Sequence, residues 1–274
     1  MSAFVSHIAK WRLVPDGAEI ETHSSWLLPV HQSAIPAMLK VYKPHSDERP
    51  GTDYLRYLDG EGAVRVLAAD DGALLMERAM GSRSLLDMAV NGQDIGTGEI
   101  LAGMVAKLHA PRAGPMPRSL VPLEQNFSSL FKRADEDPRL RLSAAAARAL
   151  LAAPRGVIPL HGDLHHSNVL DGGMRGWLAV DPKGLLGDRT YDVANLMGNP
   201  WPHGEVVHST ERMRRMAELY AARLDMDAHR VRAFALAHAG LAASWDLDEG
   251  LDPGYRLRCA EVLAPLVAIS SLTT

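Results

Sequence analysis

HGDLHHSNVL, residues 161–170, is the stretch that decides the fold of this chain. A second apolar run, Trp177 to Val180, follows after the glycine-containing segment Asp171 to Gly176, and Asp181 comes directly after it. Two short apolar runs separated by such a segment predict a β-hairpin. Antiparallel pairing places the start of the first strand beside the end of the second. We therefore expect Asn168 and Asp181 to lie close together.

The polar residues of this stretch have the spacing of a kinase catalytic loop. Asp163 and Asn168 fit the pattern D-x-x-x-x-N, in which the aspartate orients a substrate hydroxyl and the asparagine holds a magnesium ion. Asp181 supplies the second metal ligand, because Mg²⁺ prefers oxygen. Aspartate and asparagine are also common in turns, and this spacing alone is a weak motif. The full pattern, with both strands and the final aspartate, is more demanding and predicts a phosphoryl-transfer site.

The composition agrees with an enzyme of the cytosol, which is a reducing compartment. A chain of 274 residues can bury a large core and fits one large domain or two modest ones. Its formal net charge of -4 argues against a nucleic-acid-binding surface. The single cysteine, Cys259, rules out an internal disulfide. Met1 to Pro15 has no apolar run of signal-peptide form, and no stretch has the length of a membrane span. We expect a cytoplasmic protein that needs no nucleic-acid, membrane or protein partner.

Apolar spacing divides the chain into a strand-rich first part and a helical second part. Extended segments separated by turn residues are predicted at Ser25 to Val30, Ala37 to Tyr42, Val64 to Ala68 and Leu74 to Met76. From Gly98 onward the apolar spacing is near 3.6 residues, and it predicts helices at Ile100 to His109, Leu120 to Ala134, Ser143 to Ala153, Thr210 to Leu224, Ala228 to Trp245 and Arg256 to Ser270.

These features resemble the aminoglycoside phosphotransferase family, specifically its streptomycin 6-kinase and hydroxyurea phosphotransferase branch. The likeness is carried by Leu160 to Asp192, which contains HGDLHHSNVL, GWLAVDPKGLLGD and YDVAN. It extends more weakly to Ala37 to Lys40, Asp47 to Leu67 and Ala242 to Trp245. The resemblance implies an α+β, protein-kinase-like fold of two lobes with ATP between them. The smaller, β-rich N-terminal lobe is expected at residues 1–78, and the larger, helical C-terminal lobe at residues 79–274.

The resemblance also implies which charged residues contact the nucleotide phosphates. Lys40 matches the family's strand-borne lysine, and Lys43 is the fallback. The partner carboxylate is expected from the next predicted helix, Asp47 to Leu58. Glu48 is the residue that matches the family position, and Asp53 is the second choice because it lies on another face of that helix.

The expected phosphate loop departs from the protein-kinase pattern. No glycine lies between Ala18 and Lys40, so the motif G-x-G-x-x-G is absent. The turn from Thr22 to Ser25 is left to cover the phosphates, and Ser24 and Ser25 can donate hydrogen bonds to them. An ordinary polar turn between strands is an equally good interpretation of this segment.

The hinge that holds the adenine is expected where the two lobes meet. Met76 to Ala79 resembles the family's hinge. The backbone groups of Glu77 and Ala79, and not their side chains, are expected to bind the base.

Five acidic residues near the C-terminal side of the motif divide into a structural one and four candidates for the acceptor site. By resemblance, Asp192 occupies a position that steadies the catalytic loop. The acidic run at residues 246–252 contains no basic residue and could receive the cationic groups of an aminoglycoside, although such a run is usually a solvated helix end. The acceptor-site candidates are Asp188, Asp246, Asp248 and Glu249.

Three classes of function are consistent with these residues. The leading one is a phosphotransferase with an alcohol group as acceptor. It uses ATP and Mg²⁺ to phosphorylate a hydroxyl of an aminoglycoside-like antibiotic, with streptomycin expected and hydroxyurea or another small hydroxyl compound as the alternative, and with Asp163 as the base. The second is a metallohydrolase built on His161, Asp163, His165 and His166, but ligands so close together on one loop rarely reach a single ion. The third is a catalytically silent nucleotide-binding protein.

Overall fold

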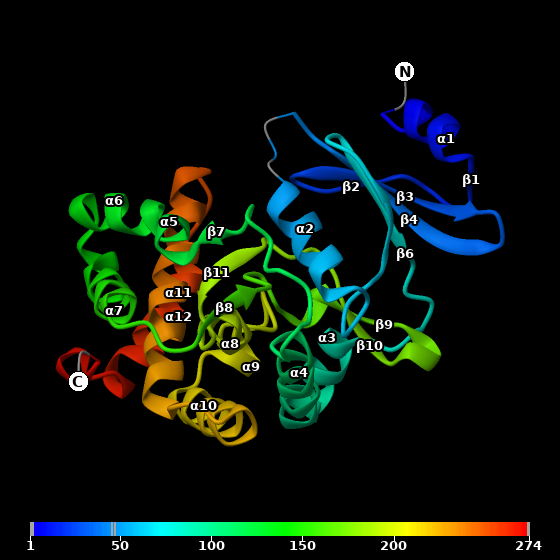
Figure 1. Cartoon of the computed structure of the whole chain (residues 1–274). Helices are drawn as coiled ribbons and strands as arrows, with labels where there is room; N and C mark the ends of the chain where they lie inside the picture. The colour runs from blue at the N-terminus through cyan, green and yellow to red at the C-terminus, as the bar shows by residue number, and fades with distance from the viewer. Residues whose placement is uncertain (1–2, 45, 47, 273–274) are drawn as a thin grey trace.

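The computed structural model of the protein describes residues 3–44, 46 and 48–272. Figure 1 shows a smaller part built on a sheet, followed by a larger part that is mainly helical. The sheet consists of β1 (Leu13–Pro15), β2 (Ile20–Glu21), β3 (Ser25–Gln32), β4 (Ile35–Tyr42), β5 (Val66–Ala69) and β6 (Ala73–Glu77). Two helices accompany it, α1 (Val5–Trp11) and α2 (Arg49–Leu58).

The two faces of this sheet have different surroundings. The strands run in the order β1-β3-β4-β6-β5, with β2 paired to β3, and all neighbours are antiparallel. Because side chains alternate along a strand, one face carries Leu39 and Val41 of β4, which are buried in a cluster with Phe4 beside α1. The other face carries Lys40, which is paired with Leu27 of β3. Lys40 is therefore directed away from the core of the sheet and towards the rest of the molecule.

The predicted strands of this part are confirmed as β3, β4, β5 and β6. The prediction missed α1, β1 and β2, because β1 and β2 have only three and two residues with mostly exposed side chains and so show no clear period. The predicted helix from Asp47 to Leu58 is present as α2 and begins at Arg49, with Pro50 in its first turn. Asp47 itself lies outside the described residues.

The larger part packs its helices around α11 (Ala228–Asp248), which contacts α7, α8, α10 and α12. Small residues let these helices approach closely. A Cβ at Gly240 of α11 would lie 2.2 Å from the Cβ of Ser143 in α7, so only glycine fits there. Within the described residues, none of the helices is both long and apolar enough to cross a membrane. The helices are α3 (Leu85–Met88), α4 (Asp94–Leu108), α5 (Leu123–Asn126), α6 (Ser128–Glu136), α7 (Arg141–Ala152), α8 (Tyr191–Met197), α9 (Gly204–Val207), α10 (Thr210–Leu224) and α12 (Gly254–Leu263).

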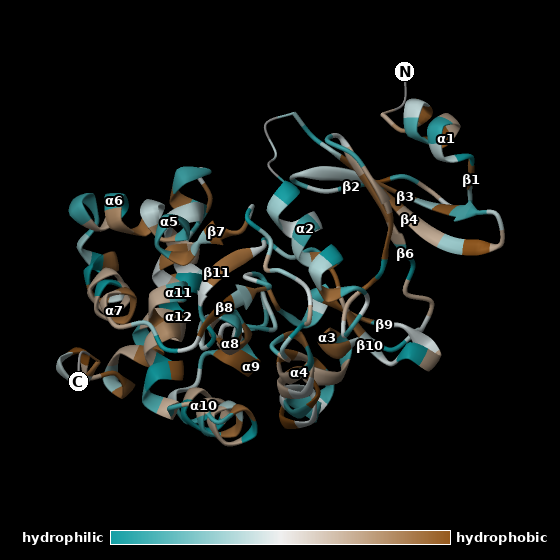
Figure 2. Cartoon of the chain, in the orientation of Figure 1, coloured by the Kyte–Doolittle hydropathy of each residue, from teal (hydrophilic) through white to brown (hydrophobic). Residues whose placement is uncertain are grey.

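Apolar spacing located most of these helices and failed where proline interrupts the chain. In α10 the buried residues lie on one side and hydrophilic residues cover the other, which is the pattern that predicted it (Figure 2). The expected helix from Leu120 to Ala134 is instead β7 (Val121–Pro122) followed by α5 and α6. The expected helix from Arg256 to Ser270 ends at Leu263, two residues before Pro265. Proline has no N–H for the helix and clashes with the preceding turn.

Two small sheets hold the stretch that begins at His161. β8 (Val157–Leu160) leads into it and pairs antiparallel with β11 (Leu185–Asp188), which also pairs with β7. The predicted hairpin is confirmed as β9 (Val169–Asp171) and β10 (Trp177–Ala179), with Leu178 opposite Leu170. The stretch that begins at His161 therefore runs from the end of β8 to the start of β9.

The linker after β6 is fastened to this hairpin by Asp171. The Asp171 carboxylate accepts hydrogen bonds from Arg83 Nε at 2.8 Å and from its terminal nitrogen at 2.9 Å. Its backbone oxygen accepts from the Gly81 N–H at 2.7 Å. The expected boundary between residues 78 and 79 stays a prediction, but this linker fixes how the sheet lies relative to the hairpin.

A buried ion pair joins β11 to the central helix α11. Asp188 is 2% exposed and accepts from Arg230, which is 4% exposed in its side chain, at 2.5 and 3.0 Å. The same carboxylate accepts from the backbone N–H groups of Arg155 and Thr190. The carboxylate is buried and bound by groups of the protein itself, so the expectation that Asp188 faces a substrate is wrong.

We predict that Asp188→Asn destabilises the fold by about 3–5 kcal/mol, because it leaves the buried Arg230 guanidinium without its counter-charge. Urea denaturation measures the free energy of unfolding. The double variant Asp188→Asn/Arg230→Met should cost less than the sum of the two single changes. A single Asp188→Asn variant within about 0.5 kcal/mol of the parent, as at an exposed site, would contradict this role.

Candidate functional site

A cavity of about 350 Å³ lies between the sheet and the β9–β10 hairpin. Apolar side chains from both parts form much of its wall: Leu27, Met38, Val64, Met76, Leu170 and Val180. Lys40 and Asp181 also line it. A cavity with apolar walls and a lysine is suited to a nucleotide, whose base is apolar on its faces and whose phosphates are anionic.

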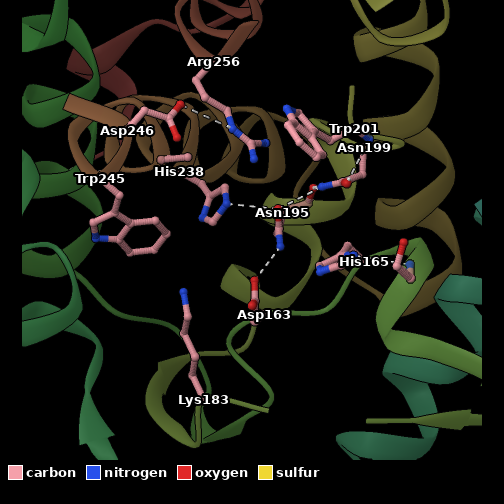
Figure 3. A pocket seen from close by; sticks show the side chains of 12 residues that line it. Asp163, His165, Lys183, Asn195, Asn199, Trp201, His238, Trp245, Asp246 and Arg256 are labelled. Carbon is pink, nitrogen blue, oxygen red and sulfur yellow. Dashed lines mark hydrogen bonds and ion pairs between the residues drawn. The ribbon is translucent and has the colours of Figure 1, made fainter. Parts of the chain in front are cut away.

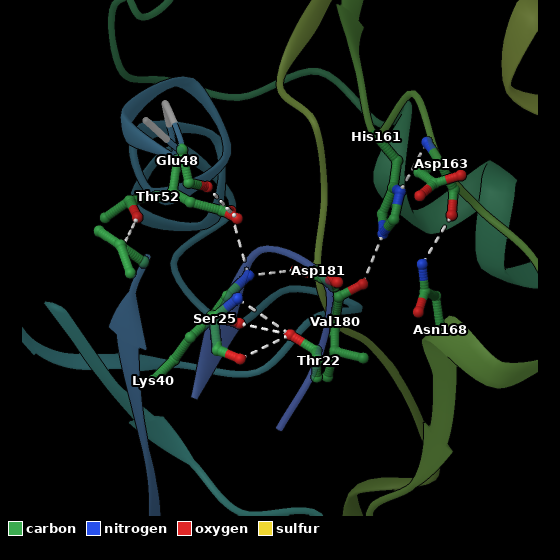
Figure 4. Close-up of polar contacts among 12 residues, drawn as sticks. Thr22, Ser25, Lys40, Glu48, Thr52, His161, Asp163, Asn168, Val180 and Asp181 are labelled. Atoms are coloured by element: carbon green, nitrogen blue, oxygen red, sulfur yellow. Dashed lines mark hydrogen bonds and ion pairs between the residues drawn. The ribbon is translucent and has the colours of Figure 1, made fainter. Parts of the chain in front are cut away.

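Lys40 is held at this cavity by two carboxylates. Its side chain is 6% exposed, and its ammonium lies 3.0 Å from Glu48 Oε2 and 2.5 Å from Asp181 Oδ1 (Figure 4). Burial by itself would lower the pKa of Lys40, but the carboxylates of Asp181 and Glu48 raise it on balance. The ammonium is therefore charged and fixed, as a phosphate-binding group must be.

The alternatives to Lys40 and Glu48 lie elsewhere. Lys43 binds Glu21 at 2.7 Å and the backbone oxygen of Thr22. Asp53 accepts hydrogen bonds from Ser119 and from Arg56 of its own helix. Of the lysine and carboxylate candidates, the structure thus brings only Lys40 and Glu48 together.

The hairpin brings Asn168 and Asp181 to the same end, as expected. Asn168 directly precedes β9, and a single residue, Val180, separates Asp181 from the end of β10. The Val180 N–H donates to the Asn168 backbone oxygen at 2.9 Å. Asn168 and Asp181 both line the first cavity, between the sheet and the hairpin. Asp181 has a φ of 58°, a left-handed conformation that aspartate tolerates better than most residues. The Asn168 amide donates to the Asp163 backbone oxygen at 2.9 Å, so its own oxygen is turned away from Asp163 (Figure 4).

His161 ties the loop of Asp163 to the hairpin. Its Nδ1 accepts from the Asp163 N–H at 3.2 Å, and its Nε2 donates to the Val180 oxygen at 3.0 Å. The ring is fully buried, and burial lowers its pKa although Asp192 and Asp163 act to raise it. A neutral ring with one donor and one acceptor nitrogen matches both contacts.

Asp192 anchors the start of the same loop, as its expected structural position requires. Its carboxylate accepts from the N–H groups of His161 at 3.1 Å and Gly162 at 2.8 Å, and from His109 Nε2 at 2.9 Å. Gly162 has a φ of 80°, and a Cβ there would lie 2.6 Å from Leu185, so the turn requires glycine.

A second cavity, of about 280 Å³, borders the loop that carries Asp163 (Figure 3). Asp163 lines this second cavity, and Ser167 lines both cavities. The remaining wall comes from the loop of Asp163, the segment after β10, α8 with the loop that follows it, α11 and α12: His165, Lys183, Asn195, Asn199, Trp201, His238, Ala242, Trp245, Asp246 and Arg256. The two cavities therefore meet at the loop that carries Asp163.

Only one of the acidic residues expected at the acceptor site reaches this cavity. Asp246 lines it, 4.0 Å from Arg256. Asp248 instead binds Arg133 at 2.6 Å and Ser129 on α6, and Glu249 lies 4.0 Å from His23. The expectation for Asp248 and Glu249 is therefore corrected. A helix turn directs successive residues to different sides, which the acidic run by itself does not reveal.

The expected phosphate turn and hinge border the first cavity. Thr22 and Ser25 line it and are hydrogen-bonded to each other, with the Ser25 N–H 3.0 Å from Thr22 Oγ1. Ser24 is not among the described residues that line it. Glu77 and Ala79 both line the cavity. The Glu77 side chain is bound by Arg175 and by the Arg65 N–H, and the Glu77 backbone N–H donates to the Arg65 oxygen at 2.9 Å. The expected contact of Glu77 with a base is therefore restricted to its backbone oxygen.

The histidines of the loop do not form a metal site. No group of three or more metal-ligating side chains occurs among the described residues. His165 accepts from the Ser167 N–H. His166 is buried, and burial followed by the charge of Arg212 lowers its pKa to about 3. The metallohydrolase interpretation has no geometric support.

Sequence reasoning missed the basic, amide and aromatic residues of the second cavity. Lys183 follows Asp181 in D-P-K-G, and its ammonium lies 3.9 Å from the centre of the Trp245 ring. Asn195 belongs to the family motif YDVAN, but the motif does not show that its side chain contacts Asp163. His238 lies in a helix of buried apolar residues, where a histidine is usually a core residue.

Comparisons with known proteins show the family of the chain. Residues 10–250 match the family model described as aminoglycoside/hydroxyurea antibiotic resistance kinase. The chain is 48% identical to the streptomycin 3''-kinase of Klebsiella pneumoniae, over 88% of this chain and 91% of that protein. It is 32% identical to the streptomycin 6-kinase of Streptomyces griseus, over 89% of this chain and 82% of that protein.

Solved structures show the fold. The aminoglycoside phosphotransferase APH(4)-Ia, in a complex with ADP and hygromycin B, aligns with a TM-score of 0.67 at 17% identity, over 96% of this chain and 98% of that one. The choline kinase LicA from Streptococcus pneumoniae aligns with a TM-score of 0.69 at 12% identity, over 95% and 97%. These likenesses confirm the α+β, protein-kinase-like fold. With the family model covering most of its length, the chain belongs to the aminoglycoside/hydroxyurea resistance kinases of the aminoglycoside phosphotransferase family, enzymes that phosphorylate a hydroxyl group.

Proposed function

We propose that the protein is an ATP- and Mg²⁺-dependent kinase that transfers the γ-phosphoryl group to a hydroxyl of a streptomycin-class aminoglycoside. The observation that carries this proposal is the meeting of the two cavities at one loop, where Ser167 lines both and Asp163 faces the second. A phosphoryl group bound in the first cavity needs to move only past this loop to reach an acceptor in the second. The named relatives, two of which act on streptomycin, support the choice of acceptor.

The residues of the first cavity fit a magnesium nucleotide. Asn168 and Asp181 offer a carboxamide and a carboxylate at one end of a hairpin, which are ligands of the kind that a hard cation prefers. When bound, Mg²⁺ would neutralise charge on the β- and γ-phosphates. Lys40 supplies a fixed positive charge beside them. Ser25, with Thr22, offers donors to the phosphates, and the backbone oxygen of Glu77 and the backbone of Ala79 bind the base.

Asp163 is the proposed base of the reaction. It accepts the proton of the acceptor hydroxyl as the hydroxyl oxygen forms a bond to the γ-phosphorus and the bond to the ADP oxygen breaks. Its position in the second cavity places it on the acceptor side of the loop. We also propose that this takes place in the cytoplasm and requires neither a protein partner nor a membrane.

The second cavity offers the acceptor both charge and stacking surfaces. Burial raises the pKa of Asp246 although Arg256 acts to lower it. A carboxylate whose charge is poorly compensated in this way would gain from a cationic group of the acceptor. Trp245 and Trp201 line the same cavity and provide flat apolar surfaces for a sugar ring. Hydroxyurea remains the alternative acceptor, because a relative that is 30% identical is named hydroxyurea phosphotransferase.

The first test is ATP consumption in a coupled assay with streptomycin, other aminoglycosides, hydroxyurea and sugar alcohols. We expect turnover with streptomycin, and Asp163→Asn should lower kcat by about two orders of magnitude because a positioned proton acceptor is lost. The KM for ATP should hardly change. Mass spectrometry and NMR of the product identify the phosphorylated hydroxyl. Turnover confined to hydroxyurea, or near wild-type kcat in Asp163→Asn, would refute the proposal.

A matched pair tests the acceptor site. Asp246→Asn should raise the KM for streptomycin about five- to tenfold, which is the scale expected for the loss of a partly exposed charge contact. Asp248→Asn, two residues away on the same helix but paired with Arg133, should leave this KM unchanged. Steady-state kinetics with both variants decide between the two. Equal effects would mean that the acidic run acts only through its general field.

Magnesium titration tests the metal site. Asp181→Asn, which suits the left-handed backbone at this position, should abolish Mg²⁺-dependent turnover. Asn168→Ala should raise the Mg²⁺ requirement and leave some activity. The double variant should be hardly worse than Asp181→Asn, because residues that act as one unit are not additive. Additive losses, or full wild-type activity in a chelator, would show that the two residues only form turns.

A further inference from the structure

A continuous hydrogen-bonded chain connects the middle of α11 to Asp163. His238 Nε2 lies 3.1 Å from Asn195 Oδ1, and Asn195 Nδ2 lies 3.0 Å from Asp163 Oδ1 (Figure 3). On its other side, His238 Nδ1 lies 3.1 Å from the Tyr191 hydroxyl, which accepts from Asn126 Nδ2 at 2.9 Å. Apart from Asp163, none of these residues is ascribed a role in the mechanism above.

The direction of each hydrogen bond in this chain is fixed by the one before it. Because the Asn126 amide nitrogen can only donate, the Tyr191 hydroxyl accepts there and has its proton free for His238 Nδ1. His238 Nε2 then carries the proton and donates to Asn195 Oδ1. The Asn199 amide also donates to that oxygen, at 3.0 Å. The NH₂ group of Asn195 is therefore left facing Asp163.

Burial makes any other arrangement costly. Tyr191, His238 and Asn195 are 1%, 5% and 8% exposed. If the Asn195 amide turned over, its NH₂ group would meet two donors, and buried donors without acceptors are expensive. Burial, followed by the positive charges of Lys183 and Arg256, holds the pKa of His238 well below its ordinary value. The ring is neutral, as the chain of donors requires.

We propose that His238 and Asn195 are positioning residues for phosphoryl transfer. They fix one carboxylate oxygen of Asp163 by a donated hydrogen bond, so that the other oxygen faces the acceptor hydroxyl. This inference rests on the proposed role of Asp163 as the base. We call the hydrogen bonds from His238 through Asn195 to Asp163 the relay. It runs from α11 through α8 to the loop of Asp163, and so couples the packing of α11 to the geometry of the Asp163 carboxylate.

A matched pair of variants at His238 separates positioning from packing. A glutamine places its amide nitrogen near the position of Nε2 and can still donate to Asn195, whereas an asparagine reaches only the position of Nδ1 and cannot. His238→Gln should keep kcat close to the wild-type value. His238→Asn should lower kcat about ten- to a hundredfold, which is the scale of a small misplacement of a catalytic group. The KM for ATP should stay unchanged in both.

Two further variants and the melting temperature complete the experiment. Asn195→Ala should lower kcat as His238→Asn does. Asp163→Asn/His238→Asn should be no slower than Asp163→Asn, because the relay acts only through that carboxylate. Thermal unfolding shows whether each variant is folded. If the His238 variants do not fold, Asn195→Ala decides alone.

The outcomes that overturn the relay differ from those that overturn the proposed function. Wild-type kcat in His238→Asn or in Asn195→Ala would refute the relay. Equal losses of kcat and of melting temperature in His238→Gln and His238→Asn would assign His238 to packing alone and refute it as well. If the wild-type enzyme consumes no ATP with any acceptor, the proposed function itself fails, and the variants are not needed to show it.

Discussion

The site depends on one buried carboxylate, Asp192, which holds an irregular backbone in place. The loop from His161 to Asn168 is neither a regular helix nor a strand for most of its length, so its N–H groups need other acceptors. Asp192 accepts from two successive ones at the start of the loop and from His109. Burial works to raise the pKa of Asp192, but these donors lower it on balance. A charged acceptor there fixes the direction in which the chain leaves β8.

The arrangement of both cavities follows from this anchor. His161, the first residue after β8, bonds at one nitrogen to the Asp163 N–H and at the other to Val180. Asp163, the proposed base, is thereby fixed relative to the hairpin end that carries Asp181. The contact of Lys40 with Asp181 then fixes the sheet relative to the hairpin. Three contacts in series thus relate Asp163, the hairpin end with Asp181, and Lys40, although these residues come from separate elements.

How much of the site could be predicted depended on whether its residues are close in sequence. The hairpin argument correctly placed Asn168 beside Asp181, because the register of a short hairpin is a local property. Lys40 and Glu48 were found through a resemblance, and only the structure shows that they meet. The sequence around Asp188 does not show whether its carboxylate binds a substrate or a buried cation, because its partner Arg230 lies 42 residues away in the chain. A buried ion pair of that separation leaves no local pattern.

The second cavity, where we propose that the acceptor binds, was predicted least well, because its wall is assembled from several elements that are far apart in the sequence. Much of its wall comes from α8, α11 and α12, whereas Lys40, Asn168 and Asp181 come from β4 and the ends of the hairpin. Substitutions in α11 can change the shape and charge of the acceptor wall without touching Lys40 or Asp181. The exception is the contact of His238 with Asn195, because it leads back to Asp163. With the positioning role that we propose for His238, a substitution at this position that suits a new acceptor would also change the geometry of Asp163, so α11 is not free to vary along its whole length.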